Sequence, residues 1–223
     1  MTNSRMHTIG FMSPPQLAEH IRQSLAGEQS RGLRHQHRRA FSPSISYGRH
    51  FGPPLPSARP AAVMVLLERC REGWMIPLTV RPSHLPDHPG QVCLPGGRIE
   101  SGESAQQAAE REFCEELGMT EFPGETLGPL QSIYVYNSDF HLTPFIAVCD
   151  HTPHYSPSPD EVEQVIRLPL NFLHDPAAIS TELRSRGVMQ WNSPGIGVEG
   201  HHVWGATAIV LGEVAGLMAV ARS

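Results

Sequence analysis

The stretch GRIESGESAQQAAEREFCEELG, residues 97–118, decides the fold of this chain. Its second half is rich in residues that favour helices. Ser104 and Gln107 have the spacing of a capping box at a helix start, and Gly118 suits a helix end. We therefore expect a helix over residues 104–117 that follows a short loop.

Three glutamates fall on one face of this helix. Glu112, Glu115 and Glu116 stand at positions i, i+3 and i+4, which are neighbours on a helix surface. Like charges side by side repel, so a helix selected for stability alone would avoid them. A hard divalent cation such as Mg²⁺ reverses that logic, because it binds carboxylate oxygens and brings phosphates with it. The preceding turn, Leu94-Pro95-Gly96-Gly97, has a backbone that can come close to such a ligand.

Length and composition are those of one globular domain with an extension. The chain has 223 residues, of which 39% are hydrophobic. The four cysteines are scattered, without the paired spacing of a disulfide framework or a zinc site, which indicates a reducing compartment and a cytoplasmic protein. Residues 1–11 lack the apolar core of a secretion signal, and the late apolar stretch 206–220 is too short to span a bilayer. We therefore expect no membrane partner.

Charge is distributed unevenly along the chain. The net charge is −5, yet residues 1–60 hold eight Arg against two Glu, while the remainder holds nine Arg against twenty acidic residues. Because the sequence contains no lysine, a phosphate clamp has to use Arg, His, backbone N–H groups or a metal. The Arg- and His-rich stretch 31–39 could contact nucleic acid. The acidic remainder would repel a polyanion, so we expect instead an arm that is mobile or contacts a second copy.

The pattern along the chain divides it into two parts. Residues 1–60 read as a basic extension and linker, with a short amphipathic helix over 14–25 and a Pro-rich linker over 51–60. Residues 61–223 read as the main domain. Its order of strands and helices predicts a mixed α+β or α/β sandwich. The expected strands are 61–67, 74–80, 91–94, 127–136, 142–149 and 163–168, and a closing helix is expected over 205–220.

The spacing of the fixed residues resembles the signature sequence of the Nudix hydrolases. Gly97, Glu103, Arg111 and Gly118 stand in register with the three glutamates. The resemblance implies a Nudix fold, an α/β/α sandwich of the α+β class with a mixed sheet between helices. The activity that it implies is hydrolysis of a nucleoside diphosphate linked to another group. It also implies catalytic roles for Glu103, Arg111, Glu112, Glu115 and Glu116. In that family the glutamates and a carbonyl of the Gly96–Gly97 turn hold Mg²⁺ or Mn²⁺, and Glu103 pairs with Arg111.

A second resemblance narrows the substrate. The segments Leu78-Thr79-X-Arg81, His88, Gly90-Gln91-Val92 and Leu94–Gly97 resemble the extra motif of the coenzyme A diphosphatase branch. This implies a small-molecule nucleotide partner, coenzyme A or acyl-coenzyme A, cleaved to 3′,5′-ADP and a 4′-phosphopantetheine product. The substrate contacts expected on this basis are Arg81, His88, Gln91, Pro95, Gly96 and Gly97.

Several alternatives stay open. Pro86 and Asp87 stand where the branch usually has basic residues, which keeps ADP-ribose or another nucleoside diphosphate derivative as an alternative substrate. A catalytically silent ligand sensor with the same fold is an alternative of another class. The general base is Glu112, Glu116 or a carboxylate near Glu161 or Glu163. A homodimer is a further expectation, by resemblance alone.

Overall fold

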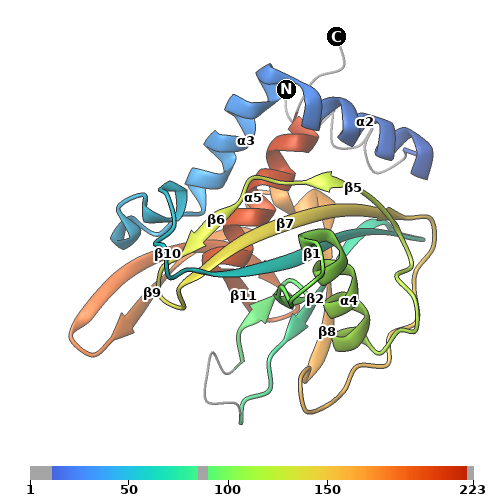
Figure 1. Cartoon of the computed structure of the whole chain (residues 1–223). Helices are drawn as coiled ribbons and strands as arrows, with labels where there is room; N and C mark the ends of the chain where they lie inside the picture. Colours follow the sequence, from blue (N-terminus) through green and yellow to red (C-terminus); the bar gives the residue numbers. More distant parts are fainter. Residues whose placement is uncertain (1–11, 85–89, 220–223) are drawn as a thin grey trace.

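A mixed sheet lies between helices on both of its faces (Figure 1). The structure, a computed structural model, describes residues 12–84 and 90–219. The central strand β1 (Arg59–Cys70) runs antiparallel to β2 (Gly73–Val80) and parallel to β7 (Phe140–Cys149). The sheet is completed by β3 (Val92–Cys93), β4 (Gly96–Arg98), β5 (Glu125–Pro129), β6 (Ile133–Val135) and β8 (Gln164–Pro169).

Strand β1 is buried on both faces because its side chains alternate between two cores. Val63 and Val65 join the core under α5 (Gly205–Ala219), whereas Met64 and Leu66 join the core under α4 (Ala105–Leu117). Full burial of an aliphatic side chain stabilises the fold by roughly 1.5–3 kcal/mol. The expected sandwich of helix, mixed sheet and helix is therefore confirmed.

One edge of β1 is shared by two partners, and this opens space beside it. The end of β1 at Glu68–Cys70 pairs with β2, whereas the segment Ala61–Val63 pairs with β4. Strand β2 meanwhile pairs with β3 through Thr79 and Cys93. The chain from β3 to β4 therefore bridges a fork between β1 and β2, and the side chains around this fork form the candidate site described below.

The first part of the chain is packed onto the domain. Helices α2 (Pro14–Ala26) and α3 (Glu28–Ala40) lie over α5 and one end of the sheet, and short 3₁₀ turns at Ser44–Ser46 and Arg49–Phe51 follow (Figure 1). Gly216 of α5 lets α3 approach closely, since a Cβ there would lie 2.5 Å from Arg34 Cα. The expectation of a mobile arm over 31–39 is wrong, because this stretch is helical and two of its arginines are buried.

A buried ion cluster joins α3 to α5. The Glu213 side chain is 0% exposed and lies 3.4 Å from Arg34 Nη1 and 3.4 Å from Arg38 Nε. Its two oxygens also accept the Gln131 N–H at 3.1 Å each. Because the cluster is buried, removing any one of these side chains would leave an uncompensated charge in a medium of low dielectric constant and destabilise the fold.

A second, three-stranded sheet follows the main one. It consists of β9 (Ile179–Arg186), β10 (Met189–Val198) and β11 (His201–Trp204), after the 3₁₀ turn Leu170–His174. The sequence pattern does not predict it, because Gly, Pro and Ser interrupt the alternation of apolar and polar residues. The single strand expected over 127–136 is likewise divided into β5 and β6. Within 12–84 and 90–219, none of the helices has the length and apolar character that a membrane span needs.

Replacing Glu213 with Gln should destabilise the fold. The change leaves two buried guanidinium groups without a countercharge, so the free energy of unfolding should fall by about 3 kcal/mol or more. Urea unfolding followed by circular dichroism measures the change. Arg31→Ala, on the exposed side of α3, is the control and should stay within about 0.5 kcal/mol of the unaltered chain. Equal midpoints for the Gln variant and the unaltered chain would show that the cluster contributes nothing.

Candidate active site

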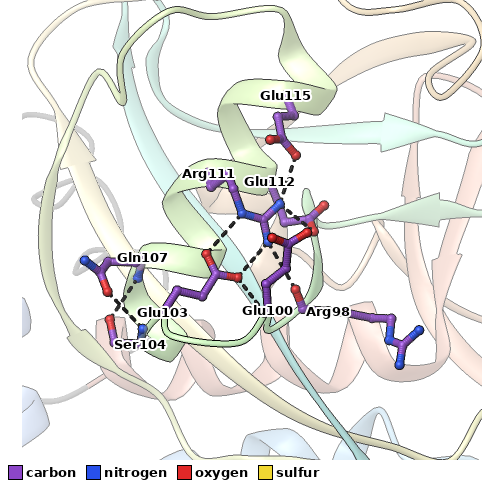
Figure 2. Close-up of polar contacts among 8 residues, drawn as sticks. All are labelled: Arg98, Glu100, Glu103, Ser104, Gln107, Arg111, Glu112 and Glu115. Carbon is purple, nitrogen blue, oxygen red and sulfur yellow. Dashed lines mark hydrogen bonds and ion pairs between the residues drawn. The ribbon is translucent and has the colours of Figure 1, made fainter.

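Helix α4 begins and ends where its sequence predicts. The Ser104 Oγ accepts the Gln107 N–H at 3.2 Å, and the Gln107 Oε1 accepts the Ser104 N–H at 2.9 Å (Figure 2). A cap of this kind stabilises a helix by about 1 kcal/mol. Gly118 ends the helix in the left-handed conformation, with φ of 64°. The face of α4 that packs on the sheet is set by its buried apolar residues Ala108, Ala109, Phe113 and Leu117.

Arg111 gathers three carboxylates and the loop before the helix. Its guanidinium donates to Glu103 at 2.8 Å, to Glu112 at 3.0 Å and to Glu115 at 2.9 Å (Figure 2). It also donates to the Arg98 carbonyl at 3.1 Å. Its bonds to Glu103 lower the pKa of that carboxyl to about 2. The expected pair of Glu103 and Arg111 therefore forms, and it holds the loop against α4.

The glycine pair allows α4 and β4 to touch. A Cβ on Gly97 would lie 2.4 Å from the carboxylate carbon of Glu112, and a Cβ on Gly96 would lie 2.3 Å from the Ala62 carbonyl oxygen. Gly96 also has φ of 153°, a backbone conformation that favours glycine. A side chain at Gly97 would thus push the Glu112 carboxylate away from the strand, and a side chain at Gly96 would push β4 away from β1.

Glu116 extends from α4 toward the fork in the sheet. Its carboxylate faces the Gly96 N–H at 3.5 Å and the Thr79 hydroxyl at 3.4 Å. Burial raises the pKa of Glu116 to about 8, with nearby Glu112 and Glu161 adding to the rise. Burial is also the main cause of the raised pKa of Glu112. Both carboxylates therefore lie where a negative charge is disfavoured.

These donors fit a divalent cation. Two partly buried carboxylates converge on a glycine strand, with Glu161 close enough to raise the pKa of Glu116. Mg²⁺ and Mn²⁺ prefer carboxylate oxygens, and a bound cation would remove the repulsion that this arrangement creates. Glu112 and Glu116 would hold such an ion, although their ligand atoms and those of Glu161 do not all lie within 4.8 Å of one another.

A cavity of about 180 Å³ opens beside Glu116. Its floor is apolar and comes from β1, β7 and α5. Its polar lining joins residues far apart in the chain, and the neighbourhood of a guanidinium and two carboxylates suits a phosphorylated ligand held together with a cation. The polar lining consists of Thr79, Arg81, Gly96, Glu116, Glu161 and Thr207.

The expected site residues separate into those at the cavity and those around it. Arg81, Gly96 and Glu116 line it, whereas Glu115 points to Arg111 and keeps 57% of its side chain exposed. Gln91 and Pro95 contribute backbone carbonyls that accept the N–H groups of Arg81 and Met64. Glu163 accepts the Ser83 N–H at 3.1 Å, which leaves Glu161 as the carboxylate of that segment at the cavity. His88, with Pro86 and Asp87, lies outside the described residues.

Two polar lining residues were not predicted from the sequence as part of the site. Thr79 follows Leu78 and precedes Val80 in β2, so its hydroxyl faces the other side of the sheet, toward Glu116. A polar residue within an otherwise apolar strand is the signal that could have identified it. Thr207 reaches the cavity from α5, and its hydroxyl donates to the Val92 carbonyl at 3.2 Å. Only the tertiary structure brings α5 to this place.

Comparisons with known proteins agree on one family. The model of the NUDIX domain matches residues 58–191. An uncharacterised Nudix hydrolase, NudL, of Enterobacter sp. (strain 638) is 33% identical over 164 residues, which are 70% of this chain and 81% of that protein. Peroxisomal coenzyme A diphosphatase NUDT7 of Mus musculus is 32% identical over 135 residues, which are 60% of this chain and 56% of the mouse protein.

Other similar proteins match shorter segments. Nudix hydrolase 3 of Caenorhabditis elegans is 35% identical over 106 residues, 46% of this chain and 44% of its own. The chain thus spans less than half of the worm protein and just over half of the mouse protein. Among solved structures, the Nudix hydrolase RenU of M. smegmatis aligns with a TM-score of 0.45 and 21% identity, over 52% of this chain and 74% of its own.

Replacing Gly97 with Ala should weaken cation binding while the fold persists. The new Cβ would displace only the flexible end of Glu112, because the backbone of Gly97 has a conformation open to other residues. Affinity for Mn²⁺, measured by the electron paramagnetic resonance signal of the free ion, should fall about tenfold or more. Gly32→Ala is the control, since that glycine has open space around it. Unchanged Mn²⁺ affinity of the Gly97 variant would remove Glu112 from the cation site.

Proposed function

We propose that this chain, which belongs to the Nudix family and is a hydrolase of phosphorus anhydrides, cleaves the diphosphate bond of coenzyme A or acyl-coenzyme A. The products are 3′,5′-ADP and a 4′-phosphopantetheine or its acyl derivative. The main support is the convergence of Glu112 and Glu116 on the glycine strand, beside a cavity that Arg81 and Glu161 share.

One relative supports the choice of substrate. The mouse coenzyme A diphosphatase is 32% identical over a segment that covers 60% of this chain. The segments Leu78–Arg81 and Gly90–Gly97 resemble the motif of that branch, whereas Pro86 and Asp87 between them depart from it, and Arg81 lines the cavity. A guanidinium suits this place because it binds phosphate oxygens in pairs and stays charged at every physiological pH.

The side chains divide the work of hydrolysis. Glu112 and Glu116 would hold a divalent cation, and Arg111 fixes Glu112 and the loop before the helix. A cation bound there would neutralise part of the diphosphate charge and lower the pKa of a water molecule bound to it. Arg81 holds a phosphate of the substrate. Glu161 accepts the proton of the attacking water, because its carboxylate lines the cavity. The Glu163 carboxylate instead accepts the Ser83 N–H.

Product analysis tests the proposed substrate. Coenzyme A, acetyl-coenzyme A and ADP-ribose are incubated with the protein and either Mg²⁺ or Mn²⁺, and the products are separated by chromatography. We expect 3′,5′-ADP from the two coenzyme A substrates, and none after the cation is removed by a chelator. Faster turnover of ADP-ribose would favour the alternative substrate class. No turnover of any substrate would favour a ligand sensor that has lost the chemistry.

Glu116→Gln tests the cation site within the same assay. The amide keeps the shape of the side chain but loses its charge, so turnover should fall by about 100-fold or more while the circular dichroism spectrum stays unchanged. Glu110→Gln is the matched control, because Glu110 lies on α4 but points away, to Thr126 and Gln106. Comparable turnover by the Glu116 variant would exclude this carboxylate from the mechanism.

A further inference from the structure

The end of strand β7 brings three side chains of metal-binding type together. Cys149 is the last residue of β7, and Asp150 and His151 follow it in a bend. A sulfur, a carboxylate oxygen and a ring nitrogen of these residues all lie within 4.8 Å of one another. Within 12–84 and 90–219, no other three side chains of Cys, His, Asp or Glu meet this condition. The cluster is therefore a candidate site for a metal ion.

The distances within the cluster are close to those between the ligands of a tetrahedral ion. His151 Nδ1 lies 3.4 Å from Cys149 Sγ. Zn–S and Zn–N bonds of about 2.3 and 2.0 Å at a tetrahedral angle place the two ligand atoms about 3.5 Å apart. His151 Nδ1 also lies 2.8 Å from Asp150 Oδ1, a hydrogen-bond distance that a bound ion would widen by about half an ångström. A small movement of the exposed Asp150 side chain is enough to admit the ion.

The backbone on both sides of the cluster is anchored to β1. Cys149 pairs with Glu68 in the parallel register of β1 and β7. After the bend, the Thr152 hydroxyl donates to the Arg69 carbonyl at 2.9 Å. The backbone N–H of His151 is also a hydrogen-bond donor to Cys149 Sγ, as is common for cysteines that bind metals. Ligands on an anchored segment lose less entropy when the ion binds.

The charges around the cluster suit a divalent cation. The Asp150 and His151 side chains are 76% and 59% exposed, so an ion reaches them from solvent, whereas Cys149 is 1% exposed beneath them. The buried Glu68 carboxylate nearby is already neutralised, because it lies 2.6 Å from Arg167 Nε. The thiolate of Cys149 and the carboxylate of Asp150 would therefore balance the two charges of the ion.

This cluster and the glutamates of α4 favour different ions. Sulfur and imidazole ligands favour Zn²⁺, whereas Mg²⁺ and Mn²⁺ prefer sites of oxygen ligands alone. The two places are also apart. Gly96 pairs with Val63, and Cys149 pairs with Glu68, five residues further along β1, which is a separation of roughly 16 Å. None of the three residues of the cluster lines the cavity.

We propose that Cys149, Asp150 and His151 bind one Zn²⁺ ion, with water in the fourth position, at a site separate from the glutamates of α4. Three protein ligands and one open position are a common arrangement for zinc. Cys70 lies near, since its sulfur is 3.1 Å from the Thr152 hydroxyl, but it does not belong to the three-residue set. The proposal does not depend on which substrate the chain hydrolyses.

Co²⁺ is the probe that tests the site in the full-length protein. Cobalt bound to a thiolate gives a sulfur-to-metal absorption band in the near ultraviolet, whereas cobalt bound to carboxylates alone does not. We expect this band in the unaltered chain, and its loss when Zn²⁺ is added, because Zn²⁺ replaces Co²⁺ and has no such band. Glu116→Gln should leave the band unchanged, since that carboxylate belongs to the cavity.

Two variants with matched controls identify the ligands. Loss of a group that only orients a metal ligand costs about 10–100-fold in affinity, so Cys149→Ser and His151→Ala should each weaken Co²⁺ binding by about 100-fold or more. Cys70→Ser and His154→Ala, which remove a thiol and an imidazole close by, should keep the unaltered affinity. Circular dichroism checks the fold of each variant.

The His151 variant keeps the test decisive even if serine at the buried Cys149 weakens the core, because His151 is exposed. Absence of the sulfur band in the unaltered chain would overturn the proposal. A band that survives His151→Ala at unchanged affinity would do so too, because it would show binding by a lone thiol. Loss of the band in Cys70→Ser would show that the sulfur ligand is a different cysteine.

Discussion

The close contact of helix α4 with strand β4 is the constraint on which the site depends. Gly97 leaves room for Glu112 to lie directly against the strand, Gly96 lets that strand lie against β1, and Arg111 ties the loop between strand and helix to the helix. The contact concentrates negative charge in a partly buried place, which raises the pKa of both Glu112 and Glu116. Electrostatic strain of this kind is typical of functional sites, because a ligand of opposite charge relieves it.

The fork in the sheet provides the room that the carboxylates face. Strand β1 changes its partner from β2 to β4, and α5 closes the space from the other side. A strand that kept one partner along its whole length would fill this space with hydrogen-bonded backbone. The catalytic helix, the forked strand and the closing helix are thus three independent contributions to one cavity.

Local sequence signals predicted the elements that depend on short-range chemistry. Helix α4 begins at its capping box and ends at Gly118, and β1, β2 and β7 follow from their apolar runs. The Nudix fold followed from the spacing of fixed residues on this helix. The sequence pattern did not predict the burial of Arg34 and Arg38, because their partner Glu213 lies far along the chain. For the same reason Thr207 was not recognised as part of the cavity, whereas Glu116 was.

The packing of α3 on α5 has a consequence for what counts as the folding unit. The family match begins at residue 58, yet α5 presents Gly212, Gly216 and the buried Glu213 to α3. A fragment that began at residue 58 would expose the apolar surface of α5 to water. It would also leave the buried Glu213 carboxylate without Arg34 and Arg38. Because residues near the start of that helix also line the cavity, we expect the amino-terminal helices to stabilise the site as well as the fold.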